Sequence, residues 1–599
     1  MVRAVAAAAL LAVALAAAAQ AAPPPRGPVY DEQGRLVKVP YAPAAPKPVL
    51  TEQQALLAFT TVPKVKHWLS RYPKASLIKQ ATYDSTYHDW DAKVWSGKAG
   101  QIAGGRVDDL SAIVTEAWTG PQVAWLMARG GKGAFGKKIN KLPVWLGFCA
   151  AFLIGLADLR RPFSLRNLDL LALLSFSVSL WYFNHGHIFA SSSLVYPGLA
   201  YLLARTIWIG LRDRPPRTSR PLWPVWVLAA ATVFLAGFKI GLNVRASNVI
   251  DVGYAGPIGA ERIVHGQSPY GNFPVEDDRK PCGPADRNGE IRDRIQTNGR
   301  CESANPNGDT YGPVSYLSYI PGYALFGWSG KWDKLRAAHF TSIAFDMLCL
   351  IGLGLVGWRF GGARLGVTLA FAWAAYPFTQ YASNSNSNDA IMPAFLIWGF
   401  WLSTSHWARG FFGGLAGWTK FAALIVVPLW ATYPEARWNR RTRRSVLLYL
   451  AGFAIATAAS FWVLLLEPNP LHAARVFWDR TIPTQIDRHS PFSIWDWGQY
   501  HAAGLPDLSW IQKVLEVVLV AAAGLFAVLP RKKTPLQLAA LTGALLIGFE
   551  VVLTHWFYLY LPWFFGFVAY AVLAAEPRRA EETAVSPDEH QARELVATG

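Results

Sequence analysis

The chain has few charged residues for its length. Asp, Glu, Lys and Arg make up only 16% of its 599 residues, whereas 52% are hydrophobic. This composition argues against a string of soluble domains, although the length would allow several. The apolar residues instead gather into runs of roughly 17–21 residues, the length that a helix needs to cross a bilayer. The sequence therefore predicts an all-α polytopic membrane protein.

Acidic residues are scarcer than basic ones. The chain has 39 Asp and Glu against 57 Lys and Arg, a formal net charge of +18. Such a charge can indicate nucleic-acid binding, but here the arginines lie in short loops between apolar runs, which is typical of the cytoplasmic side of a membrane protein. We therefore expect membrane lipid, and no nucleic acid, as a partner. The loops are residues 158–166, 212–220, 437–444, 531–533 and 578–579.

Cysteine is scarce as well, with four in the chain. No Cys and His residues are spaced as in a zinc site, so no metal is expected. Cys149 and Cys349 lie inside apolar runs and are expected to be inert packing residues. Cys282 and Cys301 share one polar loop, where a disulfide would stabilise the fold by about 3 kcal/mol.

The first 50 residues are expected to precede any folded domain. Residues 1–21 have a basic start, an Ala/Leu-rich core and a small-x-small ending, which predicts a signal peptide cleaved after Ala21. An uncleaved anchor is the alternative, and either one delivers the next segment outside the cytoplasm. Residues 22–50 are rich in Pro and Ala and are typical of a linker. The polar residues 577–599 predict a disordered cytoplasmic tail.

Residues 51–140 predict a small α+β domain. Thr51 is a candidate N-cap for a helix that ends at Pro73, and alternating stretches separated by Gly and Asp turns follow it. One helix followed by a few antiparallel strands resembles a PepSY-type domain, a small extracytoplasmic module. The resemblance covers about 90 residues without a sharp motif.

The rest of the chain predicts about eleven spans. Residues 143–222 carry additional N-terminal helices, and residues 223–576 form the main transmembrane core. The arginine loops and the signal peptide agree that the long loops 244–336 and 467–511 are extracytoplasmic. The expected spans are 144–157, 168–184, 191–211, 223–243, 338–357, 364–381, 388–404, 445–466, 512–529, 535–553 and 556–575.

Residues 410–431 are apolar but cannot be one full crossing. They begin near Arg409 and end before the arginine loop at 437–444, so both ends should face the cytoplasm. We therefore predict a broken, re-entrant hairpin that turns near Gly417–Lys420. Non-helical backbone and a buried lysine are tolerated at that depth only where they line protein or a water-filled cavity.

On this topology, polar residues that are costly in a membrane converge at the outer side. Cations there can hold a phosphate group, and a carboxylate can deprotonate an attacking hydroxyl. Asp251 is the candidate base, because it follows the run 223–242 where the chain would meet water. The candidate substrate-binding residues are Lys420, His555, Asn388, Asp389, Arg488 and Tyr311, with Arg475 and Arg480 nearby in the second outer loop.

An ordered set of motifs over roughly residues 225–575 resembles the GT-C class of membrane glycosyltransferases. It is most similar to the actinobacterial polyprenyl-phosphomannose-dependent mannosyltransferases. The motifs are Asp251 with YAGPIGAERIVHGQSPYG after it, TYGPVSYLSYIP, NSNDAIMPAFLIWGF, RGFFGGLAGWTKFAALIVVPLW and THWFYLYLPWF.

The resemblance implies that Asp251 is the general base of an inverting attack in which polyprenyl phosphate leaves, usually without a cofactor. Two features depart from the family pattern. The soluble unit and the helices of 143–222 precede the aspartate, and the paired aromatic-Pro-Pro motif appears as Tyr311-Gly312-Pro313. These departures leave the acceptor open.

Each candidate also has a structural interpretation. Asp251 could cap a helix or pair with Arg245 or Arg262. Lys420 could extend to the membrane surface, and His555 could be an interfacial neighbour of Trp556. Asn388 and Asp389 could close a turn and cap the next helix.

Three secondary candidates are Asp346, His339 and Glu261. Asp346 and His339 lie seven residues apart on one face of a span, where Asp346 could instead pair with a neighbouring helix. Tyr311, Trp495 and Trp497 could stack on a sugar.

The residues favour a multi-pass plasma-membrane glycosyltransferase with an extracytoplasmic active site. Its partners would be a polyprenyl-phosphate-linked sugar, such as mannose or arabinose, and an envelope glycan or glycolipid acceptor. One alternative is a transporter or flippase of lipid-linked sugars, which predicts internal repeats that the sequence does not show. Another is a non-enzymatic envelope protein, for which so many spans would be excessive.

Overall fold

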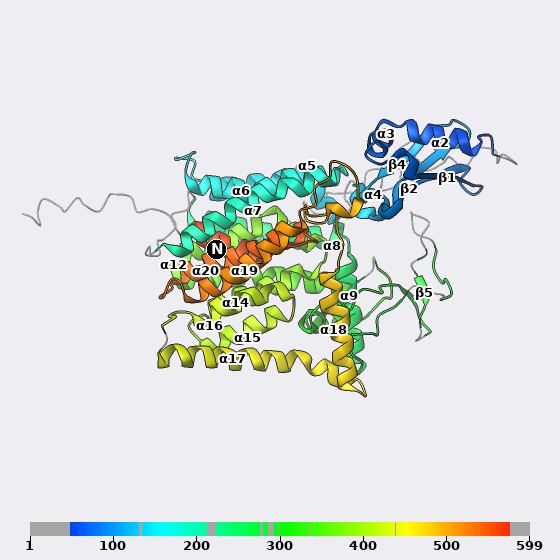
Figure 1. Ribbon diagram of the computed structural model, residues 1–599. Coiled ribbons are helices and arrows are strands. Elements are labelled where there is room, and N and C mark those ends of the chain that lie inside the picture. The colour runs from blue at the N-terminus through cyan, green and yellow to red at the C-terminus, as the bar shows by residue number, and fades with distance from the viewer. Residues whose placement is uncertain are drawn as a thin grey trace, which may run out of the picture.

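The computed structural model describes residues 48–574, apart from 131–134, 213–222, 276–278, 285–290, 292, 297–298, 333–334 and 438. The expected signal peptide, most of the linker and the expected tail lie outside these residues. The described part is mostly helical, with a small sheet domain at one end of a helical bundle (Figure 1).

The N-terminal domain pairs two short helices with one antiparallel sheet. Thr51 caps the first helix in a capping box with Gln54, as the sequence predicts. The helical stretch then divides at Pro63, whose ring fits the first turn of a new helix but not a helix interior. Its elements are α2 (Glu52–Thr61), α3 (Pro63–Leu69) and the strands β1 (Leu77–Asp84), β2 (Asp89–Ser96), β3 (Gln101–Asp108) and β4 (Val114–Thr119), in the sheet order β1-β2-β3-β4.

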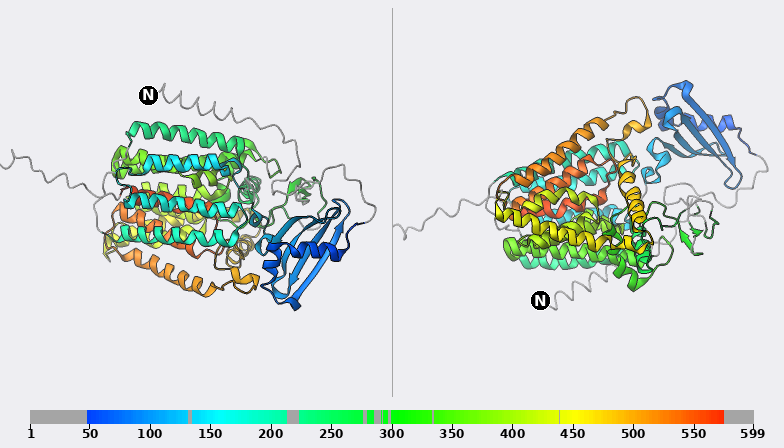
Figure 2. Two further views of the ribbon diagram at one scale, coloured as in Figure 1. Left: turned by 90° about the horizontal axis from the view of Figure 1, so that it is seen from above. Right: turned by 60° about the horizontal axis from the view of Figure 1, so that its bottom comes forward.

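This domain is held against the bundle by aromatic contacts. The Trp68 ring stacks on Phe189 with centroids 5.9 Å apart. Tyr72 donates a hydrogen bond of 2.8 Å to the Tyr500 carbonyl, and the Ala503 N–H donates to the Arg71 carbonyl. The domain therefore packs on the loop that precedes α19. Two further views show the domain at the same end of the bundle (Figure 2).

Six helices of the described chain are long and apolar enough to cross a membrane. Several of the other expected spans are shorter or interrupted helices. The six are α7 (Ile188–Leu211), α8 (Val225–Ala246), α12 (Arg336–Ala375), α17 with its 3-10 extension (Arg440–Leu466), α19 (Ser509–Val528) and α20 (Pro535–Val552). Other bundle helices are α5 (Leu142–Leu156), α6 (Leu165–Asn184), α13 (Pro377–Asn384), α14 (Ile391–Trp401) and α21 (Leu561–Ala574).

Helix α12 is two antiparallel arms. Gly362 has φ of 77°, a left-handed conformation that suits glycine, and it breaks the helix. A Cβ added to Gly357 would lie 2.6 Å from the Gly366 Cα, although these residues are nine apart in sequence. Such contact requires the chain to fold back, which agrees with two expected spans that meet at a turn between Arg359 and Arg364.

The expected hairpin at 410–431 is also bent back on itself. Its arms are α15 (His406–Gly417) and the 3-10 helix η6 (Phe421–Val426) followed by α16 (Val427–Thr432). Arg409 is fully buried and donates hydrogen bonds of 2.7 Å to the carbonyls of both Trp430 and Tyr433. Both ends of the hairpin therefore meet at one place, and the turn carries Lys420 to the other end.

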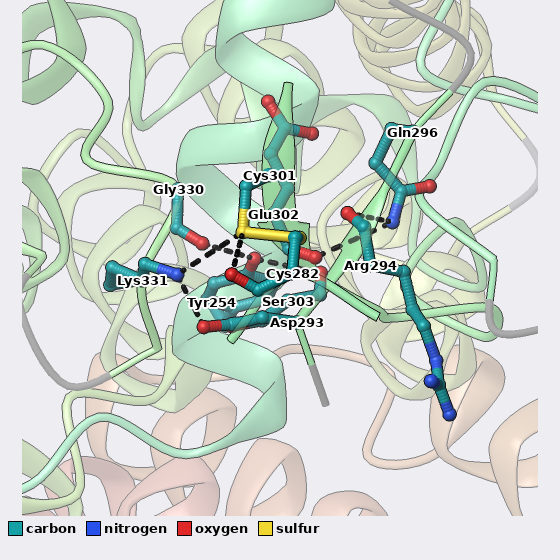
Figure 3. Close-up of a disulfide and its surroundings, with 10 residues drawn as sticks. All are labelled: Tyr254, Cys282, Asp293, Arg294, Gln296, Cys301, Glu302, Ser303, Gly330 and Lys331. Carbon is teal, nitrogen blue, oxygen red and sulfur yellow. Dashed lines mark hydrogen bonds and ion pairs between the residues drawn. A yellow bond between two sulfur atoms is a disulfide. The ribbon is translucent and has the colours of Figure 1, made fainter. Parts of the chain in front are cut away.

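The two long loops lie at the same end of the bundle as the N-terminal domain (Figure 1). Cys282 and Cys301 form the expected disulfide, with Cα atoms 5.8 Å apart. Tyr254 ties this loop to α9 by donating to the carbonyls of Ser303 and Gly330 (Figure 3). The elements here are α9 (Asp251–Val264), β5 (Asp293–Ile295), β6 (Cys301–Ser303), α10 (Pro313–Leu317), α11 (Ile320–Phe326) and α18 (Pro470–Ile486).

An ion pair joins α8 to α12 in the interior of the bundle. Lys239 and Asp346 are both about 1% exposed, and their charged atoms lie 2.9 Å apart. Trp373 donates a hydrogen bond to the same carboxylate, and Thr379 accepts one from Lys239. Asp346 thus has the structural role that the sequence left open, pairing with a neighbouring helix.

We predict that Lys239→Met destabilises the protein by about 3–5 kcal/mol, because it leaves the Asp346 charge buried without a partner. The midpoint of thermal unfolding in detergent measures this. Lys93→Met is the control, since Lys93 pairs with Asp91 on the exposed sheet surface and such pairs contribute about 0–1 kcal/mol. Equal shifts in the two variants would contradict the prediction.

Candidate active site

A cavity of about 1470 Å³ is lined by segments from the end of the bundle where the N-terminal domain lies. Its walls come from the segment before α5, the start of α9, the hairpin turn, the loop after α18, the N-terminal half of α19 and the C-terminal end of α20. It is lined by all but one of the principal residues that the sequence predicts: Asp251, Tyr311, Asp389, Lys420, Arg488 and His555.

Asp251 is the first residue of α9, and backbone contacts present it to the cavity. The N–H groups of Asn248 and Ile250 donate to carbonyls of residues 383–389, the end of α13 and the turn after it, which we call the loop 383–389. A Cβ added to Gly253 would lie 2.0 Å from the Asn386 carbonyl oxygen, so α9 packs directly on this loop. Only glycine allows that approach, and it fixes the position of the helix N-terminus.

The carboxylate of Asp251 is exposed to the cavity but surrounded by protein. Burial raises the pKa of Asp251, and the charges of Arg488 and Lys420 oppose part of the rise. In the described part of the chain no ion pair joins Asp251 to Arg245 or Arg262. Arg262 pairs instead with Glu261 at 3.2 Å.

Lys420 is held at the hairpin turn by one carboxylate and three aromatic rings. Its Nζ lies 2.6 Å from Asp389 Oδ1, which also accepts a hydrogen bond of 3.1 Å from Trp563. The ammonium lies 5.1 Å from the centroid of the Trp563 ring and 5.5 Å from those of Tyr311 and Tyr560. These contacts fix the cation beside the cavity, where cation–π attraction supplements the ion pair.

Arg488 is half-buried in the loop after α18. Within the described residues its guanidinium makes no hydrogen bond and no ion pair, although it lines the cavity. A guanidinium presents several N–H donors in a plane that matches a phosphate or carboxylate. Arg488 is therefore available to an anionic ligand without first breaking a contact within the protein.

His555 lies between α20 and the 3-10 helix η9 (Tyr558–Tyr560). A hydrogen bond of 2.9 Å joins its Nδ1 to Ser490, and the ring packs 5.6 Å from Phe492. Burial lowers the pKa of His555 well below its ordinary value, and the charges of Arg488 and Lys420 lower it further. His555 is thus neutral at pH 7 and acts as a hydrogen-bonding group there.

The other sequence candidates lie in structural networks away from the cavity lining. Asn388 is buried and donates 2.7 Å to Ser315. His339 bonds to Asn243, and Glu261 pairs with Arg262 and Arg300.

The remaining candidates in residues 467–511 contact other protein side chains. Arg480 pairs with Asp309, whereas the exposed Arg475 lies 3.9 Å from Asp479. Trp495 and Trp497 pack against Tyr196 and Phe189.

Several residues that line the cavity were not among the candidates predicted from the sequence. Lys137, Lys138 and Lys141 line it from the segment before α5, and Glu516 lines it from α19. The three lysines could have been noticed from the sequence, because positive charges beside a span on the expected outer side break the positive-inside rule. Glu516 is an acid inside an expected span, which is a functional candidate by default.

The inner part of the cavity is apolar. Ile425 of η6, Leu519 of α19 and Phe549 of α20 line it. Helix α19 also carries exposed large side chains, among them Val517 and Val520. The cavity therefore joins a charged end to an apolar end beside a helix that presents apolar surface.

No protein-family model, no curated protein and no solved structure matches this chain.

We predict that Gly253→Ala destabilises the protein by about 1–3 kcal/mol, because the new methyl group would overlap the Asn386 carbonyl oxygen and force α9 away from the loop. Thermal unfolding in detergent measures the change. Gly147→Ala is the control, since a Cβ there meets nothing within 4 Å. A Gly253→Ala protein as stable as the control would show that the contact does not hold α9.

Proposed function

We propose that the protein is a membrane glycosyltransferase that transfers a sugar from a polyprenyl-phosphate donor to an envelope glycan or lipid acceptor. The observation that carries this proposal is one cavity that combines an exposed carboxylate, an arginine open to an anion, and an apolar end. A lipid-linked sugar phosphate needs the last two, and transfer to a hydroxyl needs the first.

The donor phosphate is assigned to Arg488 and Lys420. Arg488 can form charge-assisted hydrogen bonds to phosphate oxygens. Lys420 is already neutralised by Asp389, so it supplies a fixed N–H donor rather than a free charge. The hydrocarbon chain would lie along Ile425, Leu519 and Phe549 toward the bilayer.

Asp251 is assigned as the general base. It takes the proton from the acceptor hydroxyl as that oxygen forms a bond to the anomeric carbon. The bond from that carbon to the phosphate oxygen breaks, and the phosphate leaves with the electron pair and is held by Arg488. A direct attack of this kind inverts the anomeric configuration, as the resemblance to the polyprenyl-phosphomannose-dependent enzymes implies.

The arginine loops support an outward-facing site in the plasma membrane. Of the described ones, the loops between α5 and α6 and between α19 and α20 and the N-terminus of α17 lie at the end of the bundle opposite the N-terminal domain (Figure 1). Arginine-rich loops remain on the cytoplasmic side. Nucleotide sugars are not available on the outer side, so a lipid phosphate is the donor that fits this placement.

We predict that Asp251→Asn lowers sugar transfer by about 10²–10⁴-fold, the usual contribution of a general base. Membranes supplied with radiolabelled polyprenyl-phosphate sugar measure the transfer. Asp479→Asn is the control, because Asp479 is an exposed partner of Arg475 on α18. Unchanged transfer in Asp251→Asn would refute the assignment, and lipid flipping that persists in proteoliposomes without transfer would favour a transporter.

We also predict an acidic limit to the transfer rate. The base must be deprotonated to act, and burial raises the pKa of Asp251 above its ordinary value. The rate therefore falls as the pH drops through this raised pKa. The pH dependence of kcat/KM, which reports groups of the free enzyme, checks it, with thermal unfolding over the same pH range as the control. A rate that stays constant down to pH 4, near the pKa of about 3.9 of a free aspartate, would contradict it.

A further inference from the structure

Three lysines form a second charged group in the cavity, which we name the lysine cluster: Lys137, Lys138 and Lys141. They lie on the 3-10 helix η4 (Lys137–Asn140) and at the N-cap of α5, and all three are exposed and line the cavity. In the described residues no carboxylate pairs with any of them.

The lysine cluster is held in place by the elements that position Asp251. The Gly136 N–H donates 2.6 Å to the Asn248 side chain, and the Asn384 side chain donates 3.1 Å to the Gly136 carbonyl. Asn248 lies three residues before Asp251, and Asn384 belongs to the loop on which α9 packs. Ile139 of η4 is fully buried and packs into the hydrophobic core of the bundle. The backbone that carries the lysines is therefore fixed by hydrogen bonds and core packing.

The charges of the cavity are unbalanced in a way that one phosphate does not remove. Five Lys and Arg side chains line it against three Asp and Glu side chains. Lys420 is paired with Asp389, and a donor phosphate would neutralise Arg488. Three lysines then remain against the carboxylates of Asp251 and Glu516, and neither carboxylate forms an ion pair with them in the described residues. Three like charges within five residues also repel one another, so an anion bound among them would be stabilised.

We propose that the lysine cluster binds an anionic group, phosphate or carboxylate, on the second substrate, whose hydroxyl Asp251 deprotonates. This inference rests on the proposed function and names the acceptor class: an anionic glycan or glycolipid. Lysine suits the role because its ammonium is a point charge on a flexible stem, which holds an anion without imposing one orientation.

Binding tests this proposal without any transfer, so it can fail independently of the proposed function. The triple variant Lys137→Gln, Lys138→Gln, Lys141→Gln is compared with Lys66→Gln, Lys74→Gln, Lys79→Gln, which removes three exposed lysines of the N-terminal domain. Both are purified in neutral detergent in the Asp251→Asn background. Native mass spectrometry measures retention of phosphatidylglycerol against phosphatidylcholine. Matching melting temperatures establish that both variants fold.

We expect the lysine-cluster variant to retain phosphatidylglycerol at least tenfold less well than the control variant, with no change for phosphatidylcholine. Displacement of phosphatidylglycerol from the control by inorganic phosphate would support the site and show that the anion alone suffices. Retention that inorganic phosphate does not displace would support it with a lipid headgroup as the source. Equal retention by the two variants would overturn the proposal.

Where transfer is established in the otherwise native protein, the same lysine-cluster variant has a second readout. Its KM for the acceptor should rise at least tenfold while its kcat stays within twofold, because the lysines bind the ground state and the transition state alike. A fall in kcat at unchanged KM would overturn the assignment to acceptor binding.

Discussion

The ion pair between Lys420 and Asp389 is the contact on which the cavity depends. Lys420 stands where the hairpin turns back, and Asp389 opens the segment that leads into α14. A charge and a broken backbone are both costly at the depth of a membrane, and each is tolerated only against protein or water. Here the turn places the Lys420 ammonium beside a buried carboxylate and three aromatic rings. These contacts offset the free energy of burying the charge and the broken backbone. The same turn thereby becomes a wall of the cavity.

The loop 383–389 links this pair to the rest of the site. Asn386 adopts a left-handed φ of 48°, which asparagine tolerates, and its side chain donates to the Asn248 carbonyl. Its carbonyl meets Gly253, and its neighbour Asn384 holds Gly136. One polar loop therefore sets the positions of the candidate base, of the paired lysine and of the lysine cluster. A displacement of this loop would alter all three together.

The sequence predicts the residues of this site better than the elements around them. Asp251, Lys420 and His555 could be placed together because arginine loops and a signal peptide orient every span. The hairpin was predictable for the same reason, since Arg409 and the loop 437–444 forbid a full crossing. Lys137 and its neighbours break the positive-inside rule, but their place beside Asp251 could not be predicted, because it depends on contacts of Gly136 with Asn248 and Asn384, which are distant in sequence. The neutral state of His555 depends on burial and on nearby charges that no local pattern records.

The N-terminal domain has a physical connection to the charged end of the cavity. Its residues Tyr72 and Trp68 contact Tyr500 in the loop that precedes α19. The segment that leaves the domain then places Trp125 against Phe492 and His555. Arg488 lies at the start of the loop held between these contacts, and it has no protein partner of its own in the described residues. The domain therefore limits where the loop that carries Arg488 can move. Trp125 and Met127 of this segment also line the cavity, so the chain ahead of the bundle helices contributes directly to a cavity wall.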